Sequence, residues 1–482
     1  MENTLSFFGV ALYIIDWIIR IVFVIYIPRK RKPTVAMAWL LAIFIFPIAG
    51  MLLYLIIGDP KLSRRRRDQQ QSIDRLIETS TRSIELEPHG LTKLERERYM
   101  PLINQNKALG KLPAHRGNKI SIIDNYQQMI DDMIAEVNNA KETVYIEFYI
   151  MALDDSTRPF YDALEQAVKR GVDVYVLFDA LAIRKYKDFR KMKRLLTRIG
   201  VKWRAILPIR FSLGQYNRPD LRNHRKIVAI DDQVGYIGSF NMIDRSYQRK
   251  DNVLYDELVV KMHGPVVRQT SAIFAGDWYS ETNRAPFSIR EPIIAKQKSG
   301  MLAQVLPSGP SYDHENNLKL FVSLLYKAKK RITIVNPYFV PDEALLTAVI
   351  SAAKRGVEIT IVNSEVKDQW MVGHAQRSYY EQLLKAGVTI YLHKAPIFLH
   401  SKHITVDDDI AVIGSSNMDI RSFQLNLECV VVIYDKSFVS KLKKIQAKNI
   451  KNSHKVTLRK WQNRPPAEEV LDSIARLTSS LQ

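Results

Sequence analysis

Long apolar runs open the chain, and shorter amphipathic patterns follow them. Residues 5–27 form an apolar run of membrane-spanning length, in which the only charged residues, Asp16 and Arg20, stand one helical turn apart and are able to pair. A second run covers residues 34–57 and contains one proline and one glycine. The first run is too long for a signal peptide and lacks a basic start and a small-residue cleavage site. The pattern therefore predicts two N-terminal membrane segments.

Basic residues flank both runs and give conflicting orientations. Arg29 to Lys32 lie between the runs, and Lys61 and Arg64 to Arg67 follow the second. Such residues mark the cytoplasmic side of a membrane segment. We expect two spans, with the five basic residues after the second run outweighing the four between the runs. A second segment that bends back near Pro47 is the alternative. In both cases the rest of the chain is expected to be cytoplasmic, with Arg64 to Arg67 close to anionic lipid heads.

An α/β pattern follows a basic linker and helix at 61–109, and this pattern occurs twice. Each copy starts with an amphipathic helix and an apolar strand, at 126–139 and 143–151 in the first copy and at 318–327 and 332–340 in the second. A second helix and strand surround a Lys-Arg-Gly-Val turn in both copies. The sequence therefore predicts two copies of one α/β unit, in residues 110–300 and 301–482.

One motif occurs in both copies and is the most specific signal in the chain. Residues 223–241 read NHRKIVAIDDQVGYIGSFN, and residues 399–417 read LHSKHITVDDDIAVIGSSN. The shared chemical positions are His224, Lys226, Asp231, Ser239 and Asn241 in the first copy and His400, Lys402, Asp407, Ser415 and Asn417 in the second. Six identical residues at the same relative positions, counting the shared glycine, indicate a duplicated functional site.

Each motif is predicted to contain two short strands around an acidic turn, at 226–230 and 234–237 in the first copy. Alternation along the first strand would place the histidine and the lysine two residues later on one face. The Gly-Ser-x-Asn segment is then expected to supply a tight turn and short donors for phosphate oxygens. The candidate phosphate ligands are Ser239, Asn241, Ser415 and Asn417.

These residue types permit phosphoryl transfer through a histidine. A neutral imidazole, with an ordinary pKa of about 6.5, is nucleophilic at cellular pH. Two lysines and two asparagines could stabilise the charge on a phosphate without a metal, and a second histidine could serve as general acid and then as base. Because each copy supplies one histidine, we infer that the copies face each other around one site. No cofactor or metal is expected, since the spacing of a structural zinc site is absent.

Four acidic residues at matched positions have two interpretations each. Asp231 and Asp407 open acidic turns, where aspartate is favoured for backbone reasons alone, so a catalytic and a structural role are both open. Glu257 and Glu428 precede apolar strand runs. A carboxylate there could orient a motif histidine through its second nitrogen, or it could be an ordinary strand-edge residue.

The net charge of +21 indicates an anionic partner, either nucleic acid or an anionic membrane. The two apolar runs favour membrane lipids and argue against nucleic acid. Cys429 is the only cysteine, which excludes an internal disulfide and fits a reducing compartment.

The doubled His-x-Lys-x4-Asp-x6-Gly-Ser-x-Asn pattern resembles the phospholipase D superfamily over roughly residues 110–482. Residues 33–62 further resemble the membrane region of bacterial cardiolipin synthases. The resemblance implies an α/β fold with a mixed sheet in each half, a pseudo-two-fold site and a phosphatidyl-histidine intermediate. It also implies that His224 is the nucleophile and His400 the acid and base. On the residues alone either assignment is open, because both motifs are complete.

For function, the resemblance implies transfer of a phosphatidyl group between two phosphatidylglycerol molecules in a bacterial cell membrane, giving cardiolipin and glycerol. A phospholipase D would differ only in using water to resolve the intermediate. A nuclease would explain the charge but not the apolar runs. A basic membrane scaffold with a decayed site is disfavoured by two complete motifs.

Overall fold

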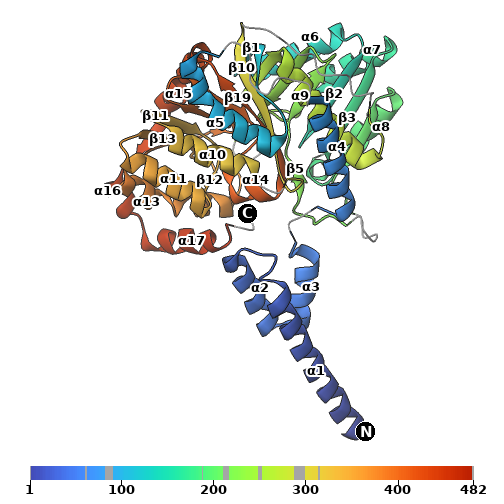
Figure 1. The fold of residues 1–482 in the computed structure, drawn as a ribbon, viewed down its shortest axis with the longest axis vertical. Coiled ribbons are helices and arrows are strands. Elements are labelled where there is room, and N and C mark those ends of the chain that lie inside the picture. The colour runs from blue at the N-terminus through green and yellow to red at the C-terminus, as the bar shows by residue number, and fades with distance from the viewer. Residues whose placement is uncertain are drawn as a thin grey trace.

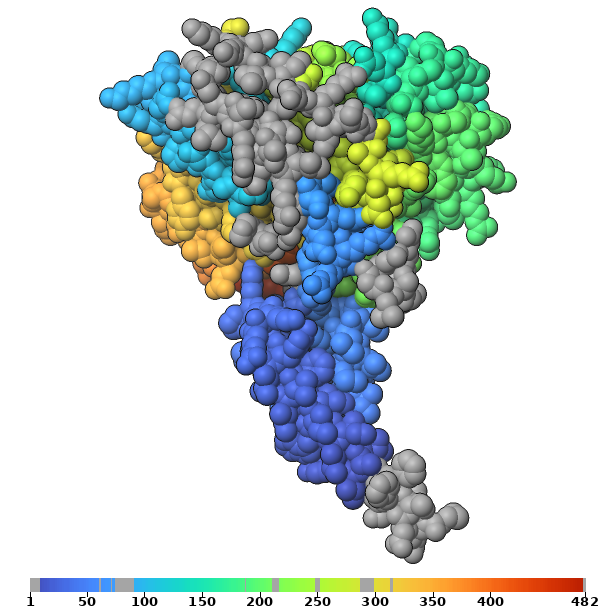
Figure 2. Space-filling model, turned by 45° about the vertical axis from the view of Figure 1, so that its right-hand side comes forward, coloured from blue at the N-terminus to red at the C-terminus, as the bar shows by residue number. Residues whose placement is uncertain are grey.

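Two α/β halves lie side by side at one end of the molecule, and a narrow stalk of helices projects from them (Figures 1 and 2). The computed structural model describes residues 2–59, 62–81, 91–186, 188–209, 216–247, 252–286, 299–312 and 315–479. The stalk consists of α1 (Glu2–Tyr26), α2 (Pro33–Ile45) and α3 (Pro47–Ile57).

The stalk contains one helix that is long and apolar enough to cross a membrane. Within α1 the candidate span is Gly9–Tyr26, with a mean hydropathy of 2.0. The predicted pairing of Asp16 with Arg20 is confirmed at 2.9 Å. Helices α2 and α3 have 13 and 11 residues, which is about 20 and 17 Å at 1.5 Å per residue, less than a hydrocarbon core of about 30 Å. The predicted second span, residues 34–57, is therefore not confirmed.

Helices α2 and α3 instead form a hairpin. The ring centroids of Trp39 and Tyr54 are 5.3 Å apart, whereas one continuous helix would separate these residues by about 22 Å. Arg31, just before α2, pairs with Asp59, just after α3, at 3.1 Å. Both ends of residues 33–57 therefore lie at the end of α1 that adjoins the α/β halves (Figure 1).

The break between α2 and α3 has a local cause. Pro47 cannot continue the hydrogen bonding of α2, and the residue before a proline is pushed out of helical geometry, as Phe46 is at φ −130° and ψ 77°. Gly50 allows α3 to lie close against α2, since a Cβ there would come within 2.8 Å of Cα of Ile43. The structure thus follows the alternative in which the second segment bends back near its proline.

Two further helices connect the stalk to the α/β halves, in the region predicted as a basic linker and helix. Helix α4 (Arg64–Thr81) packs against α9 of the first half, and α5 (Lys93–Gly110) packs against β10 and α10 of the second. Thr92 and Glu95 form a reciprocal capping box at the start of α5. Lys61 lies outside the described residues.

The first half contains nine strands and five helical elements, in the order β1 (His115–Ile123), α6 (Tyr126–Asn139), β2 (Thr143–Phe148), α7 (Arg158–Lys169), β3 (Asp173–Asp179), the 3-10 helix η1 (Ala182–Lys185), α8 (Phe189–Arg198), β4 (Lys202–Ile206), β5 (Arg222–Asn223), β6 (Ile227–Ile230), β7 (Val234–Gly238), β8 (Leu254–Asp256), β9 (Val259–His263) and α9 (Pro265–Thr282). These counts cover the described part of residues 110–300. The predicted helix at 126–139 is confirmed, and the predicted strand at 143–151 ends earlier, at Phe148.

The second half repeats this order with additions, as β10 (Met301–Ser308), α10 (Asn316–Lys327), β11 (Arg331–Val335), β12 (Phe339–Val340), α11 (Glu343–Lys354), β13 (Glu358–Ser364), α12 (Trp370–Arg377), α13 (Tyr380–Ala386), β14 (Thr389–His393), β15 (Ile397–Leu399), β16 (His403–Val406), β17 (Ile410–Gly414), β18 (Met418–Asp419), α14 (Ile420–Gln424), β19 (Asn426–Tyr434), α15 (Lys436–Lys451), β20 (Ser453–Val456), α16 (Leu458–Gln462) and α17 (Pro466–Leu477). The predicted α/β repeat with mixed pairing in each half is confirmed.

The two halves share one continuous sheet. Its order is β20-β14-β13-β11-β16-β17-β19-β10-β1-β9-β7-β6-β2-β3-β4, and β10 pairs antiparallel with both β1 and β19. Within each half, parallel strands farther from the junction pass into antiparallel strands at the centre, and in the second half the antiparallel strand β20 forms the outer edge. Apolar clusters fill the space between the sheet and its covering helices, so the central strands are buried on both faces.

The halves also exchange short segments. Strand β5 of the first half pairs in parallel with β19 of the second, and β15 of the second half pairs in parallel with β8 of the first. Each exchanged segment directly precedes a motif histidine. The exchange therefore places both motifs at the junction of the halves.

Candidate active site

The two motif histidines stand in corresponding connections. His224 follows β5 and precedes β6, and His400 follows β15 and precedes β16. The prediction that His224 and Lys226 lie on one strand is therefore corrected: regular pairing with the rest of the first half starts at Ile227. The histidines are held instead by the opposite half. The backbone N–H of His224 donates to the carbonyl oxygen of Leu427, and that of His400 donates to Asp256, both at 2.8 Å.

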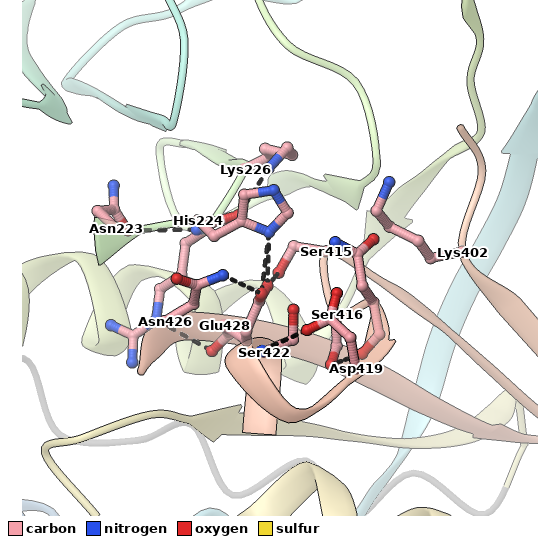
Figure 3. A network of polar contacts seen from close by, with 12 residues as sticks. Asn223, His224, Lys226, Lys402, Ser415, Ser416, Asp419, Ser422, Asn426 and Glu428 are labelled. Atoms are coloured by element: carbon pink, nitrogen blue, oxygen red, sulfur yellow. Dashed lines mark hydrogen bonds and ion pairs between the residues drawn. The ribbon is translucent and has the colours of Figure 1, made fainter. Parts of the chain in front are cut away.

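A buried glutamate of the opposite half contacts each imidazole. Oε1 of Glu428 lies 2.9 Å from Nδ1 of His224, and Oε1 of Glu257 lies 2.7 Å from Nδ1 of His400. Figure 3 shows the first of these pairs, with the His224 ring directed at the carboxyl group. The prediction that these glutamates orient the motif histidines is consistent with this geometry. Since Nδ1 is engaged, Nε2 is the nitrogen left for a substrate.

The motif serines lie behind the glutamates. Ser415 Oγ donates to Oε2 of Glu428 at 2.5 Å and accepts from the backbone N–H of Cys429 at 3.0 Å. Ser239 Oγ accepts from the backbone N–H of Leu258 at 2.9 Å. Both serines are fully buried. These contacts favour a structural role over the predicted contact with phosphate, because Ser415 fixes Glu428 and both hydroxyl groups bind the neighbouring strand.

The glycine before each serine serves close strand packing. A Cβ at Gly238 would come within 2.3 Å of the carbonyl oxygen of Leu258, and a Cβ at Gly414 would be equally close to that of Cys429. Only glycine lets the motif strands β7 and β17 approach β9 and β19 this closely. The expected phosphate-binding turn is in fact a strand-packing position.

Both motif lysines are buried beside the histidines. Lys226 Nζ donates to the carbonyl oxygen of His224 at 2.7 Å, and Lys402 Nζ donates to that of His400. Burial lowers the pKa of Lys226 to about 7 and that of Lys402 to about 8. The charged form of each lysine is therefore disfavoured because it has lost its water shell. A bound anion would favour the charged form and raise both pKa values.

Burial also sets the protonation of the His–Glu pairs. It lowers the pKa of both imidazoles well below the ordinary value, and the nearby lysines add to this effect. It raises the pKa of Glu257 and of Glu428 to about 7. At neutral pH, both imidazole rings are therefore favoured in their neutral form. An incoming phosphate would counter the field of the lysines and make protonation of a histidine easier.

One cavity of about 1100 Å³ joins the two motifs. His224, His400, Asn241 and Asn417 all line it, so the structure brings together the residues that the sequence predicted to share a site. Asn241 accepts a hydrogen bond from the backbone N–H of Ile150 through Oδ1, which leaves its amino group for a ligand. Among the residues that the structure describes, Oδ1 of Asn417 is buried and has no hydrogen-bond partner.

The motif aspartates lie at the other end of the motif strands and do not line the cavity. Asp231 accepts from the backbone N–H groups of Lys141, Glu142 and Thr143 at 2.7 to 2.8 Å. It stands at φ 52°, a left-handed conformation that aspartate tolerates better than most residues. The contacts favour the structural interpretation over the catalytic one.

Asp407 repeats this arrangement in the second half. Its carboxyl group accepts from the backbone N–H groups of residues 329 to 331, at 2.8 to 3.2 Å. Arg98 of α5 also pairs with Asp407 at 2.9 Å. The second motif aspartate thus ties α5 and the start of β11 to the motif turn.

Several residues of the site were not found from the sequence. Arg222 pairs with the fully buried Asp179 at 3.1 Å, and the same carboxyl group accepts from the backbone N–H of Asn223 at 2.9 Å. The repeat offers no signal for this pair, because the corresponding positions carry Phe398 and Ser364.

Two aromatic rings and one further cation also adjoin the histidines. Tyr149 and Tyr255 make edge contacts with His224 and His400, at centroid distances of 5.0 and 5.3 Å. Arg421 lines the cavity and helps to lower the pKa of His224. Arg421 does recur in the repeat, but its counterpart Arg245 is turned toward the carbonyl oxygen of Tyr255.

Among the described residues, no group of three His, Cys, Asp or Glu side chains is arranged to hold a metal ion. The polar side chains that line the cavity include the two motif imidazoles, the amides of Asn241 and Asn417 and the guanidinium group of Arg421, together with several aspartates. The ammonium groups of Lys226 and Lys402 are buried beside the histidines and are not among the described residues that line the cavity. These groups can bind a phosphate and move protons, which is the chemistry that the motifs predict.

Known proteins share this architecture. A family model described as "Cardiolipin synthase, PLD-like domain" matches residues 133–278 and 321–449, and a "Phospholipase_D-nuclease N-terminal" model matches residues 17–58. In the fold, the chain is similar to phosphatidylserine synthase of Haemophilus influenzae, with a TM-score of 0.60 and 16% identity over 79% of this chain and 99% of that one.

Curated relatives match almost from end to end. The chain is 30% identical to cardiolipin synthase A of Proteus mirabilis, over 94% of each chain, and 30% identical to cardiolipin synthase of Geobacillus kaustophilus, over 94% of this chain and 90% of the relative. It is 32% identical to cardiolipin synthase 1 of Bacillus cereus, over 96% of this chain and 92% of the relative. The chain therefore belongs to the cardiolipin synthase family of phospholipase-D-like proteins.

Proposed function

We propose that this protein synthesises cardiolipin from two molecules of phosphatidylglycerol. The observation that carries the proposal is the pair of buried histidines on one cavity, each with Nδ1 on a glutamate of the opposite half. This arrangement supplies a nucleophile and a general acid for one phosphodiester. The family relatives, whose names state the same product, support the choice of lipid.

In the first step, Nε2 of His224 attacks the phosphorus of one phosphatidylglycerol. A P–N bond forms, the bond from phosphorus to the glycerol oxygen breaks, and His400 gives its proton to that oxygen, so that glycerol leaves. Glu428 stabilises the positive charge that develops on the attacking ring through Nδ1–H. The product of this step is a phosphatidyl group on His224.

In the second step, the glycerol hydroxyl of another phosphatidylglycerol attacks the same phosphorus. His400 takes the hydroxyl proton, the new P–O bond forms and the P–N bond to His224 breaks. Two phosphodiesters are exchanged in sequence, so no nucleotide is needed. Glu257 holds His400 in one orientation for both proton transfers.

An asymmetry of charge supports His224 as the nucleophile. Lys226, Lys402 and Arg421 all lower the pKa of His224, whereas the cations that act on His400 are the two lysines. A cation beside the attacking ring favours the neutral imidazole, which is the nucleophilic form. Arg421 and the two motif asparagines line the cavity, where charge develops on the phosphate.

We infer that the α/β halves lie on the cytoplasmic face of the bacterial cell membrane, with α1 as the span and α2–α3 as a re-entrant hairpin. The basic segments 29–32 and 64–67 then lie on one side, because Arg31 pairs with Asp59 and Lys32 pairs with Glu315 of the second half. This removes the conflict with the positive-inside tendency that two spans would create. Basic residues on this side would also attract anionic lipids.

The proposal is tested with the full-length protein in vesicles that contain labelled phosphatidylglycerol. Cardiolipin and glycerol are expected in equal amounts, and phosphatidic acid as the main product would show a hydrolase instead. In a quenched reaction, mass spectrometry of the His400→Ala variant should find a phosphatidyl adduct on His224. An adduct on His400 in a His224→Ala variant would reverse the assignment of roles.

A further inference from the structure

The C-terminal helix α17 has an inverted pattern of burial. Its polar residue Asp472 is fully buried, whereas its large apolar residues are exposed, by 57% for Val470, 39% for Leu471, 53% for Ile474 and 82% for Leu477. A helix on the surface of a water-soluble domain normally does the opposite. The inversion indicates that the outer face of α17 meets something apolar.

The inner face of α17 is fixed to the second half by ion pairs. Asp472 contacts Nδ1 of His374 at 2.7 Å and Nε of Arg377 at 3.3 Å, both on α12. Glu468 pairs with Arg377 as well. The helix is therefore held in one orientation, and its apolar face cannot be turned inward without breaking a buried charge cluster.

The exposed apolar residues lie on one side of the helix. Relative to Val470, the other three residues follow at one, four and seven positions along the chain. At about 100° per residue, these offsets place all four side chains on one side of the helix. Asp472 is on the opposite side. Trp370, at the start of α12, is also exposed, by 55%, and α12 is the helix that packs against α17.

The position of α17 points to the occupant. The helix lies at the end of the α/β halves from which α1, α2 and α3 project (Figure 1). Arg459 and Lys460 of the preceding α16 are exposed, as is typical of helices that rest on an anionic lipid surface. An aromatic residue such as Trp370 is favoured at the level of the lipid head groups.

We propose that α17 is an interfacial membrane helix, which lies in the head-group region of the same bilayer that α1 crosses. Val470, Leu471, Ile474 and Leu477 insert among the upper acyl chains, and the basic residues of α16 meet anionic head groups. The catalytic halves are then attached to the membrane at two places, the stalk and α17. This second attachment limits their tilt relative to the lipid surface.

The test uses the full-length protein with Cys429 replaced by serine, reconstituted in vesicles of phosphatidylcholine and phosphatidylglycerol. An environment-sensitive fluorophore is attached at Ile474→Cys. The matched control carries it at Leu94→Cys in α5, where the leucine is 73% exposed. We expect a nitroxide on the lipid acyl chains to quench the label at 474 and aqueous iodide to quench the label at 94.

Equal iodide quenching at both positions would overturn the proposal. Protection at 474 without lipid quenching would also overturn it and would indicate a protein partner, such as a second copy of the chain. This readout needs no catalysis, so its failure and the failure of the proposed activity are distinguishable. As a second measurement, Ile474→Glu combined with Leu477→Glu should lower turnover on vesicles severalfold relative to Leu94→Glu. Turnover on short-chain phosphatidylglycerol in detergent micelles should stay unchanged.

Discussion

Glu428 contacts Nδ1 of His224 at 2.9 Å, although the two residues belong to different repeats and lie 204 positions apart in the chain. The same relationship joins Glu257 to His400. Each half therefore carries the carboxyl group that the other half needs for its histidine.

Glu428→Gln should lower kcat about 10- to 100-fold, because the amide keeps the shape of the carboxylate but not the charge that stabilises a positive His224 ring. The variant should form the phosphatidyl adduct more slowly in a single turnover. Glu365→Gln, at an exposed carboxylate, is the matched control and should match the parent protein. A decrease smaller than twofold would contradict the orienting role of Glu428.

The plot of kcat/KM against pH should be bell-shaped and narrow. Glu257 and Glu428, with pKa values raised to about 7, must be ionised to accept from Nδ1–H, so activity should fall as the pH drops below about 7. Lys226 and Lys402, with pKa values lowered to about 7 and 8, must both be charged to bind phosphate, so activity should fall again above about 7, where Lys226 is the first to lose its proton.

The alkaline limb identifies the lysines. Lys226 has the lower pKa of the two, and an arginine at that position keeps its charge at every pH, so the alkaline limb of any residual activity of Lys226→Arg should move up toward about 8, the pKa of Lys402. A phosphate already bound would raise the pKa of both lysines, so the alkaline limb of kcat should lie above that of kcat/KM. Limbs that coincide in the two profiles would contradict this explanation.

Asp231→Ala should reduce stability rather than chemistry. The side chain accepts from three backbone N–H groups, and the loss of hydrogen bonds to a charged group costs about 1.5–3 kcal/mol in the free energy of unfolding. Asp232→Ala is the control, since residue 232 has a similar left-handed backbone at φ 56°. Denaturant unfolding and the turnover per folded molecule are measured. A large decrease in turnover at unchanged stability would restore the catalytic interpretation of Asp231.

Treatment with EDTA should leave the chemical step intact, since lysine, arginine and asparagine side chains stabilise the phosphate in the proposed reaction. Adduct formation in a single turnover is the measurement, in vesicles of constant composition. Loss of the adduct, restored by one divalent ion and not by others, would show that a metal takes part.

A cysteine at position 29 reports the topology of the stalk. In a re-entrant arrangement, Arg29→Cys in a Cys429→Ser background should react with an impermeant thiol reagent only after permeabilisation. The reference is Lys354→Cys on α11 of the α/β halves. A tag before α1 should be accessible on intact cells. Labelling of position 29 on intact cells would instead support two spans.

The repeat and its chemistry could be predicted because they depend on local patterns. Short continuous runs of apolar residues define the strands β6 and β7, which are buried at every position, and the positive φ of Asp231 explains why an acidic residue opens their turn. The identity of spacing in two motifs was enough to predict a shared cavity, and His224 and His400 do line one.

The partners across the junction could not be predicted in the same way. A periodic pattern shows which face of a strand is buried but not which distant segment lies on it, so the exchange of β5 and β15 left no local trace. For the same reason, the sequence alone predicts a phosphate contact for Ser415, although the Ser415 hydroxyl donates a hydrogen bond to Glu428. Residues 34–57 are apolar and numerous enough for a membrane span, and in the sequence the proline is the signal for the bend.

The exchanged segments have a consequence for the origin of the chain. A single repeat with this topology would have its histidine without a glutamate and its glutamate without a histidine, so it could complete a site only in a symmetric dimer. In a fusion of two such copies, assembly of the site no longer depends on protein concentration. One half can then change its sequence independently of the other. The two halves do differ in this way, since Asp179 and Arg222 of the first half correspond to Ser364 and Phe398 of the second. In a homodimer, both sides of the site would carry the same residues at these positions.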